Sequence, residues 1–167
     1  ELGPGDGSMA KILIRTFKRF PEFYSSANFF LYEKSKLLIK IQKKKIKVKG
    51  NKVFWIKDFK EIKNGPVIFF GNEFFDAIPI KQFQVHRNHY FEKYLSTKRD
   101  NVREFYKKAK NSDEKKLRSF NSLKGLNFIE YPELGFQELD KIIKKILLLS
   151  GGILLIDYGY LQSQNLN

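Results

Sequence analysis

The sequence predicts an α/β fold in which helices cover a doubly wound, mostly parallel sheet. The first observation is that short apolar segments alternate with amphipathic helical segments along the 167 residues. Strands that alternate with helices form parallel sheets with right-handed crossovers. The second observation is a glycine turn, Gly3-Pro4-Gly5-Asp6-Gly7, directly before the first helical pattern. A turn of this kind is the ligand-binding end of a strand–helix unit.

The elements are expected in a regular order. The first helix runs from Ser8, its expected N-cap, to about Phe20, and Pro21 ends it. Ser35 opens a second helix, and the last helix covers about residues 136–147. Strands are expected at residues 29–32, 53–56, 67–70 and 153–156, and a hairpin at 82–85 and 90–95 with Arg87 and Asn88 near its tip.

The spacing of apolar residues predicts which helix faces are buried. The inward-facing residues are expected to be Met9, Ile12, Leu13, Phe17 and Phe20 in the first helix, and Leu37, Leu38 and Ile41 in the second.

The length indicates a single domain. We expect residues 1–167 to be only part of that domain. The hairpin and an exposed insertion are expected at about residues 81–130. Within this insertion, Val102, Phe105, Tyr106 and Ala109 suggest a helix, although Lys and Arg dominate the segment.

The composition argues for a folded domain without a membrane-spanning segment. Apolar residues make up 42% of the chain and aromatic residues 16%, which argues against disorder. No apolar run reaches the 18 residues that a membrane-spanning helix needs. The chain has no cysteine, which excludes disulfides and thiolate metal sites and fits a reducing compartment.

The net charge of +14 has two interpretations. It would suit a polyanionic partner such as nucleic acid. It would also follow from a general lysine-rich usage, with lysines spread over solvated faces and few arginines among aromatic residues. We favour the second interpretation, so a nucleic-acid partner is left open but not favoured.

Four groups of polar residues are expected at the carboxyl ends of the strands, where ligands of open α/β sheets bind. These groups are the glycine turn, Glu33, Asn72-Glu73 with Asp76, and Asp157. Their shared placement predicts a binding site at this edge of the sheet.

The spacing of the glycines indicates which class of cofactor this site would bind. A dinucleotide fingerprint G-x-G-x-x-G needs a third glycine where this chain has Ser8. An acidic residue followed by G-x-G-x-G is instead the usual opening of S-adenosylmethionine-dependent methyltransferases. We therefore expect Glu1, Gly3, Gly5 and Gly7 to bind this cofactor, whose methionine and ribose the turn would enclose.

Three further residues are candidates for the nucleoside part of the cofactor. Glu33 is suited to accept both ribose hydroxyls, and we favour this role over that of a surface glutamate. Asp58 would meet the adenine amino group and Phe59 would pack on the ring. An ordinary loop aspartate and a core phenylalanine are equally good interpretations of this pair.

Asn72, Glu73 and Asp76 are the candidate catalytic residues. Two carboxylates suit a cationic or hydrogen-bond-donating nitrogen, and a guanidinium group pairs well with carboxylates. Because the pKa of a guanidinium group is high, the site would either orient a lone pair of the nitrogen or have a carboxylate take the proton as the methyl group is transferred. The alternative is that Asn72 or Asp76 caps a short helix beginning at Phe74, which leaves Glu73 as the strongest candidate.

Asp157, Tyr158 and Tyr160 are expected to close the pocket on the substrate side. Tyr158 would alternatively be a core aromatic residue at a strand end. His86 and His89 lie at a predicted hairpin tip without further ligands nearby in sequence. Because zinc needs three or four ligands, we expect no metal site.

Several strings of the sequence, in this order, resemble the MidA-type S-adenosylmethionine-dependent methyltransferases. They are ELGPGDGS, FLYEKS, GNEFFDAIP followed by IKQF, and GGILLIDYGY. The resemblance covers nearly the whole chain and is weak only through residues 97–124. Gln42 and Arg15 match family positions, whereas Ile12 stands where the family tends to carry an acidic residue.

The resemblance implies a class I methyltransferase fold of the Rossmann-like type, with S-adenosylmethionine as cofactor and the strand order 3-2-1-4-5. Mitochondrial members of the family assist the assembly of respiratory complex I and methylate an arginine of one of its subunits. The resemblance therefore implies a protein substrate and arginine methylation. It also implies a bacterial cytoplasmic location, or the mitochondrial matrix for a eukaryotic protein.

The resemblance further implies that the chain is truncated at both ends. Family members carry a complete first strand before Glu1 and more sheet after Asp157. The strands at 29–32 and 67–70 are then expected to lose their shared neighbour, which leaves buried backbone groups unpaired. We expect the isolated fragment to be poorly stable and inactive.

Two other functions are left open by the sequence. A catalytically silent assembly or binding protein would keep the fold without using the cofactor. An RNA methyltransferase would use the basic surface, and its RNA binding would depend steeply on salt. The sequence predicts neither the oligomeric state nor the number of methyl groups transferred.

Overall fold

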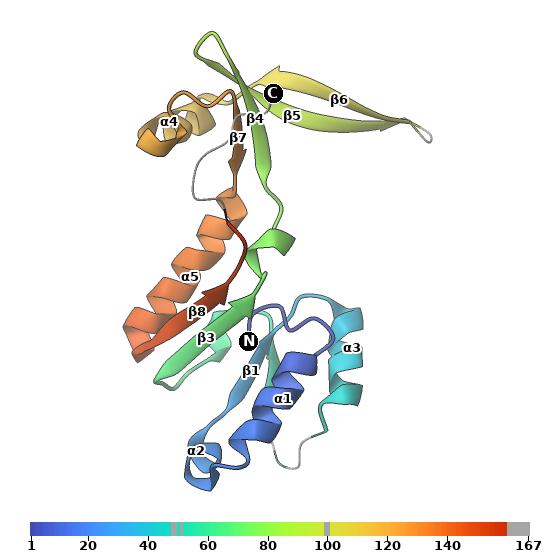
Figure 1. The fold of residues 1–167 in the computed structure, drawn as a ribbon, viewed down its shortest axis with the longest axis vertical. Helices are drawn as coiled ribbons and strands as arrows, with labels where there is room; N and C mark the ends of the chain where they lie inside the picture. Colours follow the sequence, from blue (N-terminus) through green and yellow to red (C-terminus); the bar gives the residue numbers. More distant parts are fainter. Residues whose placement is uncertain (48–49, 51, 99–100, 160–167) are drawn as a thin grey trace. The chain divides into compact units, whose positions relative to one another are not determined.

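The computed structural model describes residues 1–47, 50, 52–98 and 101–159, and the chain divides into two compact units (Figure 1). Unit 1 consists of Glu1–Ala77 and Glu138–Tyr158, and unit 2 is built mainly from Ile78–Gln137. Unit 1 carries the glycine turn and the parallel strands. Unit 2 is an antiparallel sheet with its own helix.

The helices and strands of unit 1 alternate as predicted. The strands expected at residues 29–32 and 53–56 are confirmed, and those expected at 67–70 and 153–156 are confirmed and each two residues longer. The elements are α1 (Ser8–Phe17), α2 (Pro21–Ser26), β1 (Phe29–Tyr32), α3 (Lys36–Lys45), β2 (Val53–Ile56), the 3-10 helix η1 (Phe59–Glu61), β3 (Val67–Asn72), the 3-10 helix η2 (Phe75–Ala77), the later part of α5 (Glu133–Leu149) and β8 (Gly151–Ile156).

Leu2 lies at the centre of the sheet of unit 1. β1 pairs in parallel with β2, and β3 pairs in parallel with β8. Leu2 forms a parallel bridge with Tyr32 of β1 on one side and with Gly71 of β3 on the other. The order is therefore β2, β1, Leu2, β3, β8, which matches the predicted 3-2-1-4-5 order with Leu2 in the first-strand position.

The first residues of the chain also correct one expectation. β1 and β3 were predicted to lose their shared neighbour. Beside the glycine turn this is wrong, because residues 1–3 make backbone hydrogen bonds of 2.8–3.1 Å with both strands. The sheet is thus continuous at the end where the predicted site residues lie.

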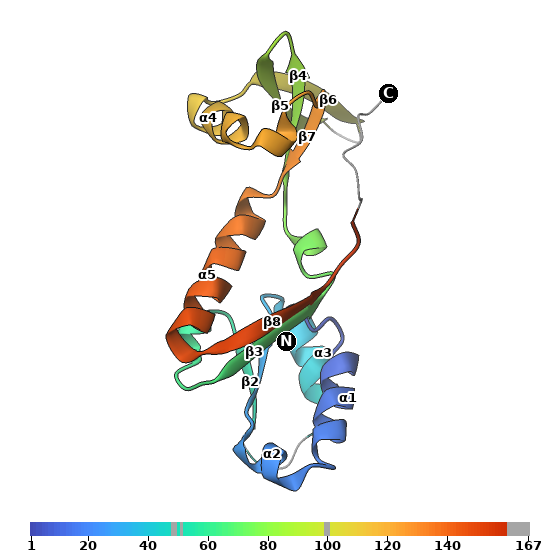
Figure 2. The ribbon, with the colours of Figure 1, turned by 60° about the vertical axis from the view of Figure 1, so that its left-hand side comes forward.

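Helices cover both faces of this sheet (Figure 2). Successive side chains of a strand point to opposite faces, so neighbours such as Leu31 and Tyr32 enter different cores. Leu31 packs with Ala10 of α1, whereas Tyr32 packs with Ile142 of α5. One core consists of Ala10, Ile14, Leu31 and Ile46, and the other of Leu2, Tyr32, Ile56, Phe59, Ile62, Phe69 and Ile142.

α1 differs from its prediction at both ends and in its buried face. Gly7, not Ser8, is its N-cap, and Pro21 opens α2 directly after it, since proline suits the first turn of a helix. The buried residues are Ala10 and Ile14, whereas Met9, Ile12 and Phe20 are exposed. The small Ala10 side chain lets the helix lie close to the sheet.

α3 begins as predicted but buries an unexpected residue. Ser35 is its N-cap and accepts a hydrogen bond of 3.3 Å from the Leu38 amide. The prediction that Leu37 and Ile41 face inward is wrong, because both are exposed. The fully buried residue of this helix is the polar Gln42.

Unit 2 is a four-stranded antiparallel sheet in the order β6, β5, β4, β7. The predicted hairpin is confirmed, and both Arg87 and Asn88 at its tip have positive φ, as a tight hairpin turn requires. The elements of unit 2 are β4 (Lys81–His86), β5 (His89–Lys98), β6 (Asn101–Lys108), α4 (Asn111–Ser119), the 3-10 helix η3 (Asn121–Leu123), β7 (Phe128–Tyr131) and the start of α5.

The helix predicted around Val102 to Ala109 is wrong, because most of this segment forms β6. It pairs with β5 from Asn101 to Lys108, and the ring of Phe105 stacks on that of Tyr94 at 5.6 Å. Pairing with a distant segment decides the structure here, and spacing within the segment does not show it. Nearly all of β6 is exposed, as expected for the insertion, but Ala109 and Leu117 of the same segment are buried in the core of unit 2 with Phe83 and Ile129.

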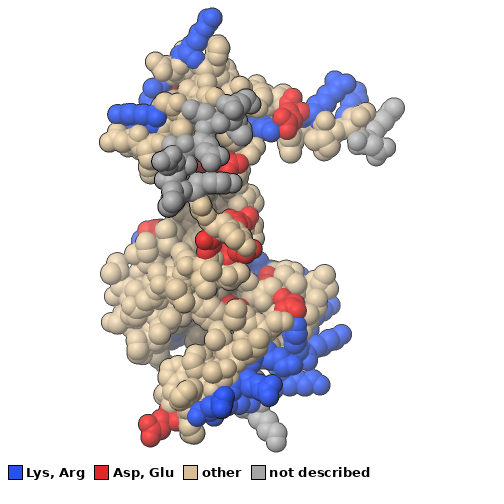
Figure 3. Space-filling model, viewed as in Figure 1, with Lys and Arg blue, Asp and Glu red and all other residues tan. Residues whose placement is uncertain are grey.

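The charge of the described surface is unevenly spread. On the face drawn in Figure 3, Lys and Arg side chains gather over the part of unit 1 that carries α1 and α3. Across the described residues, no helix combines the length and apolar character needed to cross a bilayer.

Candidate functional site

The predicted site residues of unit 1 meet at the carboxyl-end edge of its sheet. Leu2 bridges to both Tyr32 and Gly71, and Asn72 is in register with Ile156. The residues that follow these positions therefore lie at one edge. They are Gly3, Glu33, Glu73 and Asp157.

The glycine turn leaves open space at its middle residue. Gly3, Gly5 and Gly7 all have positive φ, of 59°, 54° and 82°. A side chain on Gly3 would meet Phe74 at 3.1 Å, and one on Gly7 would meet Ile46 at 3.0 Å. A side chain on Gly5 would meet nothing within 4 Å, so a ligand can approach the backbone there.

Asp6 and Lys45 tie this turn to α3. The Asp6 carboxylate accepts a hydrogen bond of 2.9 Å from the Ser8 amide and pairs with the ammonium group of Lys45. The hydrogen bonds from Lys45 and Ser8 lower the pKa of Asp6 to about 2. The turn is thereby held in one path at the start of α1.

Glu33 is a buried carboxylate with acceptor capacity to spare. Its Oε1 accepts from the Ser35 amide at 2.8 Å, and its Oε2 accepts from Gln42 Nε2 at 3.2 Å. Only 8% of the residue is exposed, so it is not a surface glutamate. Because each carboxylate oxygen can accept two hydrogen bonds, both oxygens keep a position for further donors.

Glu1 carries the one orphaned buried side-chain atom found in the described part of the chain. Its Oε2 is buried and has no hydrogen-bond partner there. Burial raises the pKa of this carboxyl group. A buried acceptor without a partner is costly, and a donor on a bound ligand would relieve that cost.

Asp58 and Phe59 follow β2 in roles that the fold itself accounts for. The Asp58 side chain accepts from the Lys60 amide at 2.8 Å and forms a capping box with Glu61. Phe59 is buried, and its ring lies 4.4 Å from that of Tyr32. Contact of either residue with a nucleoside stays a prediction.

Three carboxylates and a tyrosine lie together on the other part of the edge. Glu73 has a φ of 50°, which is strained for a residue with a side chain, and its amide donates to the Ile156 carbonyl at 2.8 Å. A hydrogen bond with Glu73 raises the pKa of Tyr158. The negative charge of Asp157 raises the pKa of Asp76.

These residues are exposed to solvent. Tyr158 is 84% exposed, so the interpretation as a core aromatic residue is wrong. Asp76 lies inside the short 3-10 turn η2, and Asn72 is the last residue of β3. Tyr160, the remaining predicted residue, lies outside the described residues.

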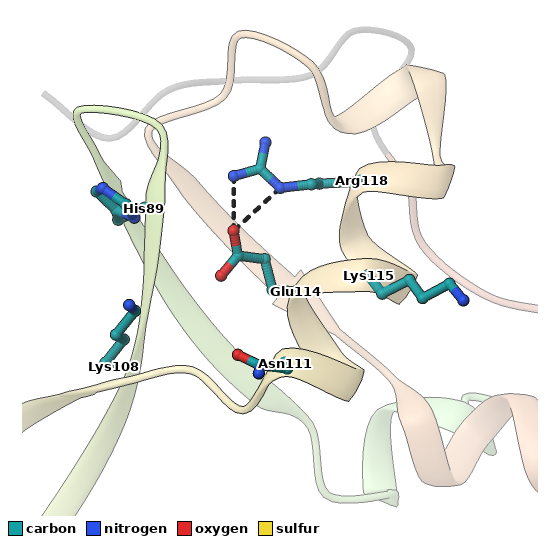
Figure 4. A pocket seen from close by; sticks show the side chains of 6 residues that line it. All are labelled: His89, Lys108, Asn111, Glu114, Lys115 and Arg118. Atoms are coloured by element: carbon teal, nitrogen blue, oxygen red, sulfur yellow. Dashed lines mark hydrogen bonds and ion pairs between the residues drawn. The ribbon is translucent and has the colours of Figure 1, made fainter.

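An open pocket in unit 2 contains none of the predicted site residues (Figure 4). In it, Arg118 pairs with Glu114 and donates to the Asn88 carbonyl, while the side chain of Lys115 points away from the other labelled residues. The lining residues are His89, Lys108, Asn111, Glu114, Lys115 and Arg118. The charges of Arg118 and Glu114 are thus paired within the unit.

Metal ligands are not grouped in the described structure. Among residues 1–47, 50, 52–98 and 101–159, no three His, Cys, Asp or Glu side chains are placed to hold a metal ion.

Two solved structures from Burkholderia thailandensis share the fold of this chain. One is described as a "likely methyl transferase" bound to S-adenosyl-homocysteine, with a TM-score of 0.71 at 18% identity over 95% of this chain and 41% of that chain. The other, an uncharacterized protein, has a TM-score of 0.73 at 17% identity over 95% and 42% of the two chains. The chain therefore has the methyltransferase fold, as predicted.

The family follows from the sequence itself. The model of the family described as "Putative S-adenosyl-L-methionine-dependent methyltransferase" matches residues 1–167, so the chain belongs to this family. It is 27% identical, over 99% of its length, to the Caenorhabditis elegans protein named protein arginine methyltransferase NDUFAF7 homolog, mitochondrial, of which it covers 43%. The Xenopus laevis protein arginine methyltransferase NDUFAF7 is 30% identical over 50% of this chain and 24% of its own length.

These comparisons confirm the predicted resemblance to the MidA-type family. The chain spans less than half the length of the curated relatives that it matches.

Proposed function

We propose that the protein containing this chain is an S-adenosylmethionine-dependent methyltransferase, and that unit 1 binds the cofactor. The observation that carries the proposal is the pairing of the glycine turn with buried Glu33 at one sheet edge. Membership of a family described by this activity supports it. A protein substrate, with an arginine side chain as the methyl acceptor, is proposed from the names of the relatives.

The residues present fit this cofactor. The open backbone at Gly5 would admit the ligand, and the spare acceptor positions of Glu33 would hold the two ribose hydroxyls. The unpaired Oε2 of Glu1 would accept from the ammonium group of the methionine part. When bound, the cofactor supplies a methyl group on a positively charged sulfur.

The acidic edge would orient the acceptor nitrogen. Glu73, Asp76 and Asp157 suit a guanidinium group, which pairs with carboxylates through parallel hydrogen bonds. The raised pKa of Asp76 makes it a better proton acceptor than an ordinary carboxylate. Asp76 or Glu73 would take the proton that the nitrogen loses, and Tyr158 would hold the Glu73 carboxylate in place.

The relatives also bear on location. Their names describe mitochondrial proteins. For a eukaryotic source we propose the mitochondrial matrix, and for a bacterial source the cytoplasm.

Methyl transfer tests the proposal directly. The full-length protein is incubated with S-adenosylmethionine labelled in its methyl group and with lysate of the source organism. Acid hydrolysis of the labelled protein then shows whether methylarginine has formed. We expect label in methylarginine, and a loss of at least about a hundredfold in rate for Glu73→Ala, as for removal of a group aligned with the reacting atoms.

The matched control is Glu22→Ala, which removes an exposed carboxylate from α2 and is expected to keep the full rate. Calorimetric titration with S-adenosyl-homocysteine separates the competing functions. Absence of binding by the folded protein would favour a catalytically silent assembly protein and overturn the proposal. Label recovered in RNA would overturn the proposal that the substrate is a protein, but not the proposal that the protein is a methyltransferase.

A further inference from the structure

Gln42 is the most completely buried polar side chain of unit 1, with 0% of the residue exposed. It lies in α3, whose other described positions are mostly lysines or apolar residues. A buried amide group without partners would destabilise the fold, so this side chain is expected to form hydrogen bonds.

The amide group of Gln42 forms hydrogen bonds with three residues at or near the carboxyl-end edge of the sheet. Its Nε2 donates to the Gly5 carbonyl at 2.7 Å and to Glu33 Oε2 at 3.2 Å. Its Oε1 accepts from Trp55 Nε1 of β2 at 2.9 Å. One side chain thus joins the glycine turn, the end of β1 and the neighbouring strand.

The chemistry of the three partners leaves one orientation for the amide group. The indole of Trp55 only donates, so it must meet the amide oxygen. The Gly5 carbonyl and the Glu33 carboxylate only accept, so both must meet the amide nitrogen.

We infer that Gln42 is a positioning residue for the cofactor, an inference that rests on the proposed function. It holds one oxygen of Glu33 while the Ser35 amide holds the other, which fixes the plane of the carboxylate. The free acceptor positions of Glu33 then point in a set direction for the ribose hydroxyls. Trp55 in turn holds the amide group of Gln42 in the required orientation.

The glycine turn depends on the same side chain. A side chain on Gly7 would lie 3.1 Å from Gln42 Cγ, so the turn and α3 are in close contact. Gln42 also holds the carbonyl of Gly5, the residue of the turn at which an added side chain would meet no neighbour. Gln42 therefore sets the distance between the two parts of the cofactor site.

The first test replaces Gln42 by methionine, which has a similar shape but cannot form these hydrogen bonds. Calorimetry on the full-length protein measures the affinity for S-adenosyl-homocysteine and for its 2′,3′-dideoxy analogue. We expect Gln42→Met to weaken binding of S-adenosyl-homocysteine about tenfold, the usual effect of a lost hydrogen bond to a charged group. Binding of the analogue, which has no ribose hydroxyls for Glu33, should weaken less, by about threefold, because for this ligand only the support of the glycine turn is lost.

Lys40→Met is the matched control, because it places the same side chain on an exposed position of α3 and should leave both affinities unchanged. Trp55→Phe is a second variant in case Gln42→Met does not fold. It removes the donor that orients the amide group and is expected to weaken S-adenosyl-homocysteine binding about threefold, again with a smaller effect on the analogue.

The outcomes separate this inference from the proposed function. Failure of the wild-type protein to bind S-adenosyl-homocysteine would overturn the proposed function. If the wild-type protein binds it, two results would overturn the positioning role. They are unchanged affinity in Gln42→Met or Trp55→Phe, and an equal loss of affinity for the ligand and the analogue.

Discussion

The hydroxyl of Tyr32 donates a hydrogen bond of 3.0 Å to the carboxylate of Glu138, which is 106 residues away in sequence. Both residues are buried. The bond joins the end of β1 to α5 on the face of the sheet opposite α1 and α3. The same carboxylate also accepts from Lys34 and Lys141.

Removal of the Tyr32 hydroxyl tests this contact. We expect Tyr32→Phe to lower the free energy of unfolding by about 1 kcal/mol, because Glu138 keeps its two lysine partners. Glu138→Ala should cost more, roughly 2 kcal/mol, since it leaves the hydroxyl buried without an acceptor. Urea unfolding measures both values, and an equal or smaller loss in Glu138→Ala would contradict the assignment.

Two glycines of the turn should respond differently to alanine. Gly5→Ala introduces the strain of a positive φ, about 1–2 kcal/mol, but meets no neighbour. We expect it to weaken S-adenosyl-homocysteine binding by more than about tenfold, because the new methyl group enters the space proposed for the ligand. Gly7→Ala adds contacts with Ile46 and Gln42 and should lower stability by roughly 3 kcal/mol.

Gly125→Ala is the matched control for Gly5→Ala. Gly125 also has positive φ and open space around it, but it lies in unit 2. Thermal unfolding should show a similar loss of stability for the two variants, while calorimetry shows lost affinity for Gly5→Ala alone. Equal affinities would show that Gly5 does not face the ligand.

The ion pair between Lys81 and Asp113 stabilises unit 2. The Asp113 side chain is only 4% exposed, and Lys81 Nζ lies 3.0 Å from its carboxylate. Lys81→Met leaves this carboxylate buried and unpaired, so we expect a loss of about 2 kcal/mol, reduced from the fully buried case by the partial exposure of Lys81. The double variant Lys81→Met/Asp113→Leu should recover part of the loss in urea unfolding, because the ion pair between Lys81 and Glu133 stays broken in it. A double variant less stable than Lys81→Met would contradict the claim that the loss comes from the unpaired Asp113 carboxylate.

Glu133 should make the stability of unit 2 depend on pH in acid. Hydrogen bonds from Lys116 and Lys81 lower its pKa from 4.5 to about 2. A carboxylate whose pKa is lowered by folding contributes stability above its unfolded pKa, and that contribution is lost as the pH falls from 4.5 to 2. We expect Glu133→Gln to flatten the stability profile in this interval.

Denaturant unfolding at several pH values between 4.5 and 2 measures how the stability of unit 2 depends on pH. Lys116→Met keeps the Lys81 contact, so it should flatten the profile only in part. Identical profiles for the wild type and Glu133→Gln would rule out this contribution.

Asp157 should control the titration of Asp76. The charge of Asp157 is the largest cause that raises the pKa of Asp76. In Asp157→Asn, we expect the pKa of Asp76 to move down toward its ordinary value. Carboxyl-carbon NMR of the labelled protein follows this titration. A pKa that stays in place would show that the two carboxylates do not interact.

The elements of unit 1 could be predicted because their signals are local. Apolar runs bounded by glycine, proline or polar residues marked its strands, and Ser35 marked the start of α3 through a cap that involves only neighbouring residues. The same local signals placed Glu33 and Asp157 directly after strands, and the structure brings both to the predicted edge.

Predictions failed where distant residues decide the outcome. β6 forms because it pairs with β5, and its own spacing suggested a helix. The buried face of α1 is set by Ala10 against Leu31 and Ile46, which spacing among large apolar residues did not show. Gln42 and Glu138 lie on helices among lysines and apolar residues, and only their partners on other elements explain their burial.

The sequence by itself determined the family, the alternation of strands and helices, and the acidic and glycine residues of the edge. These properties depend on local backbone preferences and on the identity of short motifs. Tertiary structure alone decided that Leu2 joins both halves of the sheet and that Gln42 holds Glu33 against the glycine turn. The physical reason is that these contacts form between residues far apart in sequence, where packing and hydrogen-bond partners outweigh local preference.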